Sequence, residues 1–121
     1  MNNRQQKRIY YQKLEERLIE FASNIIGIAE RLPRHVAGRY YADQVSRSGS
    51  SPALHYGEAQ SAESPADFAH KMKVGLKELR ETFVALRIIR LRRWLSEEEL
   101  QPMLQENNEL ISIFVTCIFP R

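Results

Sequence analysis

The sequence has a single cysteine, Cys117, which excludes an internal disulfide and is typical of a chain kept in a reducing cytoplasm. Its longest apolar run, residues 111–119, is interrupted by Ser112 and Thr116 and is far shorter than the roughly 20 residues of a membrane span. The basic N-terminal residues 1–8 precede no apolar segment, so nothing there indicates a signal peptide. We therefore expect a cytoplasmic protein without membrane attachment.

Motifs for catalysis or cofactor binding are also missing. The sequence contains no phosphate-binding loop, no GxGxxG and no hydrolase nucleophile elbow. The histidines, His35, His55 and His70, are scattered, and none has a catalytic partner at a useful spacing. A di-iron bundle needs two Glu-x-x-His motifs, whereas this chain offers only Asp67-x-x-His70. We expect no enzyme activity, no cofactor and no metal.

The pattern of apolar residues predicts helices and no strands. Pro33 ends the first helix because the residue before a proline is pushed out of the helical region. Ser64 and Ser96 are favourable N-caps for the third and fourth helices. After a flexible lead-in over residues 1–10, short links predict one all-α domain over residues 11–121, an antiparallel up-down-up-down four-helix bundle. The expected helices cover about residues 11–32, 37–62, 65–94 and 96–118.

Small residues fill the second expected helix, so neighbouring helix backbones can approach it closely. They include Ser46, Ser48, Gly49, Ser50, Ser51, Ala53, Gly57 and Ala59. Pro52 lies in the middle of this helix, where it removes the hydrogen bond to the Ser48 carbonyl and crowds that turn. We therefore predict a kinked second helix, with nearby serines bonding the freed carbonyls.

The third expected helix carries two apolar stripes. The first, from Phe68 to Leu86, suffices for the core of one bundle. The second would be partly exposed in a single bundle, and monomers rarely tolerate such a patch. We predict that it forms the interface of a homo-oligomer. That stripe is formed by Val84, Ile88, Leu91 and Leu95, and the expected interface residues are Val84, Ile88, Leu91 and Trp94.

Charge is divided unevenly along the chain. Residues 1–40 carry eight Lys/Arg against four Glu, and residues 63–95 carry eight against four Asp/Glu, so each segment has a net charge of +4. Residues 96–121 carry five Glu against one Arg, a net charge of −4. The basic helices either pair with the acidic one or form a ridge for phosphate. The candidate phosphate-binding residues are Lys13, Arg17, Lys73, Lys77, Arg80, Arg87, Arg90 and Arg93.

Several short motifs occur in order along the chain: Arg47-Ser48-Gly49-Ser50-Ser51, Glu58-Ala59, Asp67-Phe68 and Lys77-Glu78-x-x-Glu81-Thr82. With them the sequence resembles the small bacterial "four helix bundle protein" family. Founding members of that family are encoded within intervening sequences of large-subunit ribosomal RNA genes. The accessory variability proteins of diversity-generating retroelements are similar. The resemblance extends from about Tyr11 to Ile113, and it departs at Pro52, where the family has an aliphatic residue, and at His55, where it has Asn.

This resemblance implies a closed bundle that assembles as a homopentamer and has no known catalytic activity. The retroelement relatives imply binding of nucleic acid and of a reverse transcriptase through basic surfaces. We expect an oligomeric accessory module that binds RNA or DNA. The alternative is a structural or adaptor oligomer that binds an acidic protein, such as a reverse transcriptase-type partner, without touching nucleic acid. Polar residues at the motif positions are expected to pair between helices or subunits: Arg47, Glu58, Glu78 and Glu81.

Overall fold

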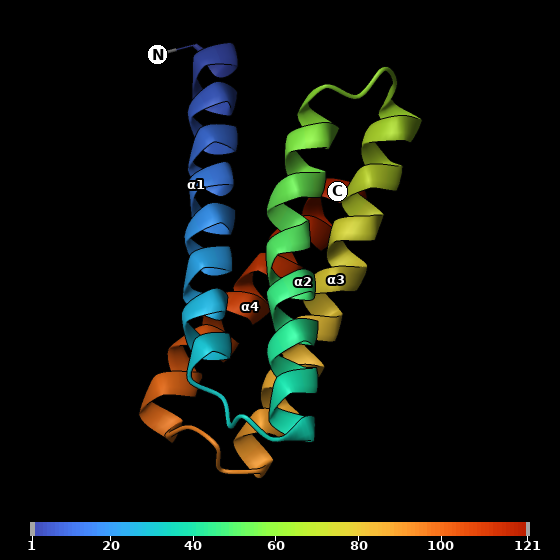
Figure 1. Ribbon diagram of the computed structural model, residues 1–121. Coiled ribbons are helices and arrows are strands. Elements are labelled where there is room, and N and C mark those ends of the chain that lie inside the picture. The colour runs from blue at the N-terminus through green and yellow to red at the C-terminus, as the bar shows by residue number, and fades with distance from the viewer. Residues whose placement is uncertain (1, 121) are drawn as a thin grey trace.

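A computed structural model of the chain describes residues 2–120 and contains four helices in this range, with no strand among them. They are α1 (Asn3–Glu30), α2 (Val36–Gln60), α3 (Pro65–Leu91) and α4 (Glu97–Ile118). Consecutive helices run antiparallel and are joined by short turns (Figure 1). The expected all-α, up-down-up-down bundle is confirmed. None of the described helices is both long and apolar enough to cross a membrane.

The helices begin where side chains satisfy their first free backbone N–H groups. Ser64 and Ser96, the expected caps, accept hydrogen bonds from the N–H groups three residues further on, at 3.1 and 3.2 Å. At the start of α2, His35 Nδ1 accepts from the N–H of Gly38 at 3.1 Å. Gly38 is required there, because a Cβ atom at this position would lie 1.9 Å from the carbonyl oxygen of Pro33.

Helix α1 starts earlier than its apolar stripe predicts. Asn2 accepts from the N–H of Gln5 at 2.8 Å, and the Gln5 side chain accepts from the N–H of Asn2 at 3.1 Å, which together form a capping box. Residues 3–10, expected to be a lead-in outside the bundle, are therefore helical. They are exposed and mostly polar, so no apolar periodicity marks them in the sequence.

Helix α2 lies between α1 and α3, and its small residues allow the expected close approach (Figure 1). A Cβ atom on Gly49 would lie 2.7 Å from Cγ2 of Ile25 on α1. On the other side of α2, the hydroxyls of Ser48 and Thr82 share a hydrogen bond of 2.8 Å. The helix is continuous through Pro52, and the predicted kink is not shown. With neighbours packed on both sides, a bend in α2 would open one of its two contacts.

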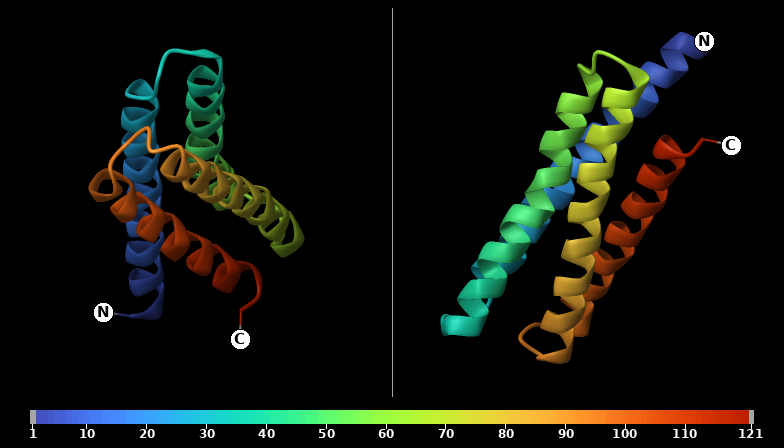
Figure 2. Two further views of the ribbon diagram at one scale, coloured as in Figure 1. Left: turned by 90° about the horizontal axis from the view of Figure 1, so that it is seen from below. Right: turned by 90° about the vertical axis from the view of Figure 1, so that its right-hand side faces the viewer.

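Helix α4 packs along α3 and contacts α1 much less, because α1 and α4 diverge (Figure 2). The shared core nevertheless receives fully buried side chains from every helix, including Phe21 from α1, Tyr56 from α2, Leu79 from α3 and Phe114 from α4. α4 is thus held chiefly by α3, and polar contacts provide part of its junction with α1.

Candidate interaction surfaces

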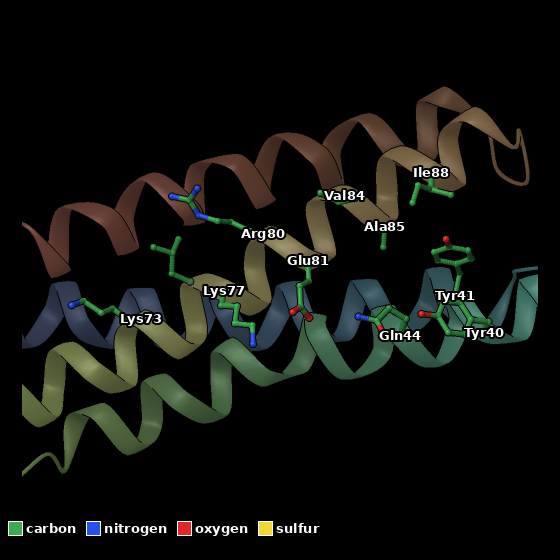
Figure 3. A pocket seen from close by; sticks show the side chains of 11 residues that line it. Tyr40, Tyr41, Gln44, Lys73, Lys77, Arg80, Glu81, Val84, Ala85 and Ile88 are labelled. Carbon is green, nitrogen blue, oxygen red and sulfur yellow. The ribbon is translucent and has the colours of Figure 1, made fainter.

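A groove of about 620 Å³ follows the outer face of α3 beside the first half of α2 (Figure 3). Tyr40 and Tyr41 of α2 form one end together with Val84, Ala85 and Ile88 of α3. This end is apolar and open to solvent: the relative exposure of Tyr40 is 60% and that of Val84 is 53%. We call these five residues the apolar end of the α2/α3 groove.

Two of the four residues expected at an oligomer interface, Val84 and Ile88, therefore lie together in a groove. Leu91, one turn further along α3, is also exposed but does not line it. Trp94 is half-buried in the turn after α3, where its ring meets the rings of His35 and Tyr41 at centroid distances of 5.5 and 6.1 Å. Trp94 thus contributes to the fold of this corner more than to the exposed surface.

Basic side chains continue along the same outward face of α3. Lys73, Lys77 and Arg80 line the other end of the groove (Figure 3). Arg87 follows two turns after Arg80. All four are exposed, and no carboxylate within residues 2–120 lies within ion-pair distance of them. At 1.5 Å per residue they span about 21 Å of helix. We call these four residues the basic face of α3.

Two other candidate phosphate-binding residues are engaged with α4. Arg17 donates from Nε and Nη2 to the two carboxylate oxygens of Glu106, at 3.0 and 2.6 Å, and Glu109 lies 3.6 Å away. The hydrogen bonds to Glu106 raise the pKa of the Arg17 guanidinium. Arg90 lies 3.7 Å from a carboxylate oxygen of Glu97. The charge pattern left open whether the basic helices pair with the acidic helix or bind phosphate. Arg17 and Arg90 pair with the acidic helix.

The remaining two candidates lie apart from the basic face. Lys13 is an exposed residue of α1 and lines a small cavity of about 180 Å³ with Arg17. Arg93 is exposed in the turn between α3 and α4, where its φ of 56° places it in the left-handed region. The eight candidates therefore divide into one row of four on α3, two that pair with α4, and two isolated cations.

The polar residues at the motif positions do not gather into one cluster. Arg47 is exposed and pairs within its own helix, with Asp43 at 3.2 Å. Glu58 reaches α3, where its carboxylate lies 3.8 Å from Lys71. Glu78 and Glu81 are half-buried on α3. Burial, followed by the charge of Glu81, raises the pKa of Glu78. Of these four residues, Glu58 makes the ion pair between helices.

A buried amide that the sequence reasoning missed joins α3 to α4. Asn107 is fully buried. In the amide orientation that satisfies both of its polar atoms, Nδ2 donates to the Leu79 carbonyl at 3.0 Å and Oδ1 accepts from the Phe83 N–H at 3.1 Å. Asn107 falls between Leu104 and Leu110 on the apolar stripe of α4, and this position was the signal that could have revealed it.

The comparisons with known proteins agree with this fold. Residues 11–116 match the 23S rRNA-intervening sequence protein family. The chain belongs to that family. A crystal structure of a protein of unknown function from the S23 ribosomal protein family of Bacteroides thetaiotaomicron is similar, with a TM-score of 0.82 and 25% identity over 88% of this chain and 98% of that one. No curated protein matches the chain by sequence. The family resemblance drawn from the motifs is thus confirmed.

The side chains that could bind a metal ion or act as a nucleophile are dispersed in the described part of the chain. Within residues 2–120, no group of three or more His, Cys, Asp or Glu side chains is arranged to hold a metal ion. Cys117 is half-buried in the last part of α4, and burial raises the pKa of its thiol. The features that stand out are therefore surfaces: the α2/α3 groove and the basic face of α3.

Proposed function

We propose that this protein is a non-enzymatic, homo-oligomeric module of the cytoplasm that binds RNA or DNA through the basic face of α3. The observation that supports the proposal is the row of exposed cations on that face, for which no carboxylate partner lies within residues 2–120. Their span of about 21 Å corresponds to roughly six nucleotides at 3.4 Å each. Arg80 and Arg87 suit phosphate because the guanidinium donates two hydrogen bonds at once.

The pairing seen in the structure refines the set of contacts. Arg17 and Arg90 are neutralised by Glu106 and Glu97, so they contribute less to phosphate binding than their charge implies. Lys13 and Arg93 are exposed but lie away from the row, where they add weaker electrostatic attraction.

Self-association strengthens the proposed binding by repeating the basic face. We assign the contact between copies to the apolar end of the α2/α3 groove, because it holds exposed apolar side chains that include Val84. The family resemblance implies five copies. Several weak phosphate contacts on a ring then act together if one strand spans neighbouring copies.

The test is a titration of fluorescent single-stranded RNA and duplex DNA with the purified protein at several salt concentrations. Affinity should fall steeply with salt, since each phosphate neutralised releases counterions. The variant Lys77→Glu/Arg80→Glu/Arg87→Glu should bind at least about tenfold more weakly, because three attractions become repulsions, each worth up to about 1 kcal/mol. Its mass by light scattering should be unchanged. Arg34→Glu, an exposed reversal in the link before α2, is the control. Absence of wild-type binding at low salt would refute the proposal.

The alternative function is an adaptor that docks an acidic protein. It is favoured by one observation, the apolar end of the groove lying next to Lys73, Lys77 and Arg80. That arrangement suits an amphipathic helix with acidic residues at one end. An oligomer that keeps its mass but binds neither RNA nor DNA at low salt would favour this alternative.

A further inference from the structure

A second groove, of about 390 Å³, lies between α3 and α4 on the other side of α3. Helix α3 contributes one aromatic side chain and two arginines, and α4 contributes three amides above a buried leucine. The lining residues are Phe83, Arg87, Arg90, Gln101, Leu104, Gln105 and Asn108. We call this the α3/α4 groove. It meets the basic face of α3 at Arg87, which belongs to both surfaces.

The three amides form a ladder along one face of α4. Gln101, Gln105 and Asn108 are spaced four and three residues apart, so they stand on successive turns, and all three are exposed. Within residues 2–120 none of their side chains takes part in a hydrogen bond. They cover about 10 Å of helix, comparable to three nucleotides at 3.4 Å. An amide offers a donor and an acceptor together, which is what the edge of a nucleobase presents.

Three of the five glutamates of α4 pair with arginines at the α1 side of the bundle and not with this groove. Glu106 and Glu109 contact Arg17 of α1, and Glu99 forms an ion pair with Arg31, the residue that follows α1. Glu97 lies 3.7 Å from Arg90, which lines the groove. No carboxylate is among the residues that line the groove. The helix that is acidic in sequence is therefore amide-rich on the side that faces the arginines of α3, and the glutamate that borders the groove, Glu97, is paired with Arg90.

An aromatic ring and a guanidinium from α3 lie close together in the lining of the groove. Phe83 is half-buried, and the guanidinium carbon of Arg87 lies 6.0 Å from the centroid of its ring. This cation–π contact orients the Arg87 guanidinium near the amides. Unstacked bases are commonly held by stacking on aromatic or guanidinium planes and by hydrogen bonds to their edges.

We propose that the α3/α4 groove binds unpaired nucleobases of a single strand whose phosphates lie on the basic face of α3. The inference rests on the proposed function and deepens it, because it adds contacts to bases and so a preference for single strands. The amides contact base edges, and Arg87 stacks on a base or bonds the adjoining phosphate.

The test compares a single-stranded oligonucleotide of adenines with an abasic strand of the same length, using the full chain. The wild type should bind the adenine strand at least about tenfold more tightly, since each base contact contributes about 1 to 3 kcal/mol. The variant Gln101→Ala/Gln105→Ala/Asn108→Ala should bind both strands alike. Its salt dependence should match that of the wild type, because no charge has been removed. Gln12→Ala/Asn24→Ala, which removes two exposed amides of α1, is the matched control and should retain the preference.

The outcomes separate this inference from the proposed function. If the wild type binds both strands equally and in a salt-dependent way, the proposed role of the α3/α4 groove is wrong, and the proposed role of the basic face of α3 is still supported. No binding of either strand overturns both. If the triple variant keeps the preference for adenines, the amides are not the contacts and the inference fails. If it loses binding to both strands and also melts at lower temperature, the amides act through the fold, which overturns the inference as well.

Discussion

The two sides of α3 present different chemistry to solvent. Towards α2, one end of the groove exposes aromatic and aliphatic side chains, and its lining also includes Glu81 and three cations, Lys73, Lys77 and Arg80. Towards α4, the lining is made of amides and arginines and includes no carboxylate. The apolar end of the first groove suits another protein chain, whereas the cations at its other end and the second groove suit a nucleic acid. A single helix can thus separate two kinds of partner because its opposite faces lie against different neighbours.

The same contrast holds beneath the surface, at the two junctions that α3 makes. The α2/α3 junction contains the hydroxyl pair Ser48 and Thr82, and Thr82 also donates to the Glu78 carbonyl at 2.9 Å. The α3/α4 junction contains the amide of Asn107, bonded to the backbone of α3. Each junction therefore has one buried polar contact whose hydrogen bonds form in only one alignment of the two helices. Small side-chain changes at either contact should therefore affect stability.

The largest effect is expected from a charge placed in the α3/α4 junction. Asn107→Asp puts a carboxylate where an amide now donates to the Leu79 carbonyl, so two acceptors face one another in a buried site. The free energy of unfolding at pH 7 should fall by about 3 kcal/mol or more, because a buried unpaired charge is costly. Urea unfolding of the wild type and the variant measures this difference in the free energy of unfolding.

The neighbouring residue is the control for that change. Asn108 is exposed in the α3/α4 groove, so Asn108→Asp should alter the free energy of unfolding by no more than about 0.5 kcal/mol. It should instead weaken nucleic-acid binding, because the new charge repels phosphate. Equal destabilisation by both substitutions would mean that the two residues do not divide between the junction and the groove as described.

A smaller effect is expected at the α2/α3 junction. Thr82→Ala removes a buried hydroxyl and leaves Ser48 without its partner, so the free energy of unfolding should fall by about 1 to 3 kcal/mol. Combining it with Ser48→Ala should cost less than the sum of the two single changes, by about 0.5 kcal/mol or more. Strict additivity would show that the two hydroxyls do not stabilise one another.

Much of the fold follows from local sequence. The apolar period predicts the helices, and Ser64 and Ser96 predict two of their starts, because both signals act within a few residues. The start of α1 at Asn3 was not foreseen, and the kink predicted within α2 at Pro52 is not shown. The start of α1 depends on a polar capping box without an apolar stripe. The course of α2 through Pro52 depends on the helices packed on both of its sides.

The candidate surfaces were only partly predictable. Periodicity placed the row from Lys73 to Arg87 on one face of α3 correctly, because helical spacing alone decides it. It did not show that Arg17 pairs with Glu106, since those residues are far apart in sequence and meet only in the folded chain. For the same reason the amide ladder of α4 was missed: it becomes a groove only beside α3.

The α2/α3 side should also respond to pH through Glu78. Burial and the neighbouring Glu81 raise the pKa of Glu78 in the folded state, so the folded protein holds this proton more tightly than the unfolded chain. The stabilising contribution is complete below the ordinary glutamate pKa and is lost as pH rises through the raised one. Glu78→Gln should therefore raise the unfolding free energy at pH 7 by roughly 0.5 kcal/mol, allowing for solvent screening. Thermal melts of the wild type and the variant at pH 7 and near pH 4 measure this gain in stability. The gain should vanish near pH 4, and a gain that persists there would have another cause.

The smallest expected effect concerns a carboxylate that precedes the amide ladder of α4 and, unlike Glu97, has no ion-pair partner within residues 2–120. Glu98 is exposed and lies one turn before Gln101, on the same stripe, although it does not line the groove. Its charge should repel a strand entering the α3/α4 groove, at a range limited by screening to about 10 Å at 0.1 M salt. Glu98→Gln should therefore tighten binding of single-stranded RNA about two- to threefold at low salt, and the gain should fade as salt is added. Glu20→Gln, which removes an equally exposed charge from α1, is the control. An equal gain from Glu20→Gln would show that binding responds only to net charge, and the contrast between the two sides of α3 would then have no role in recognition.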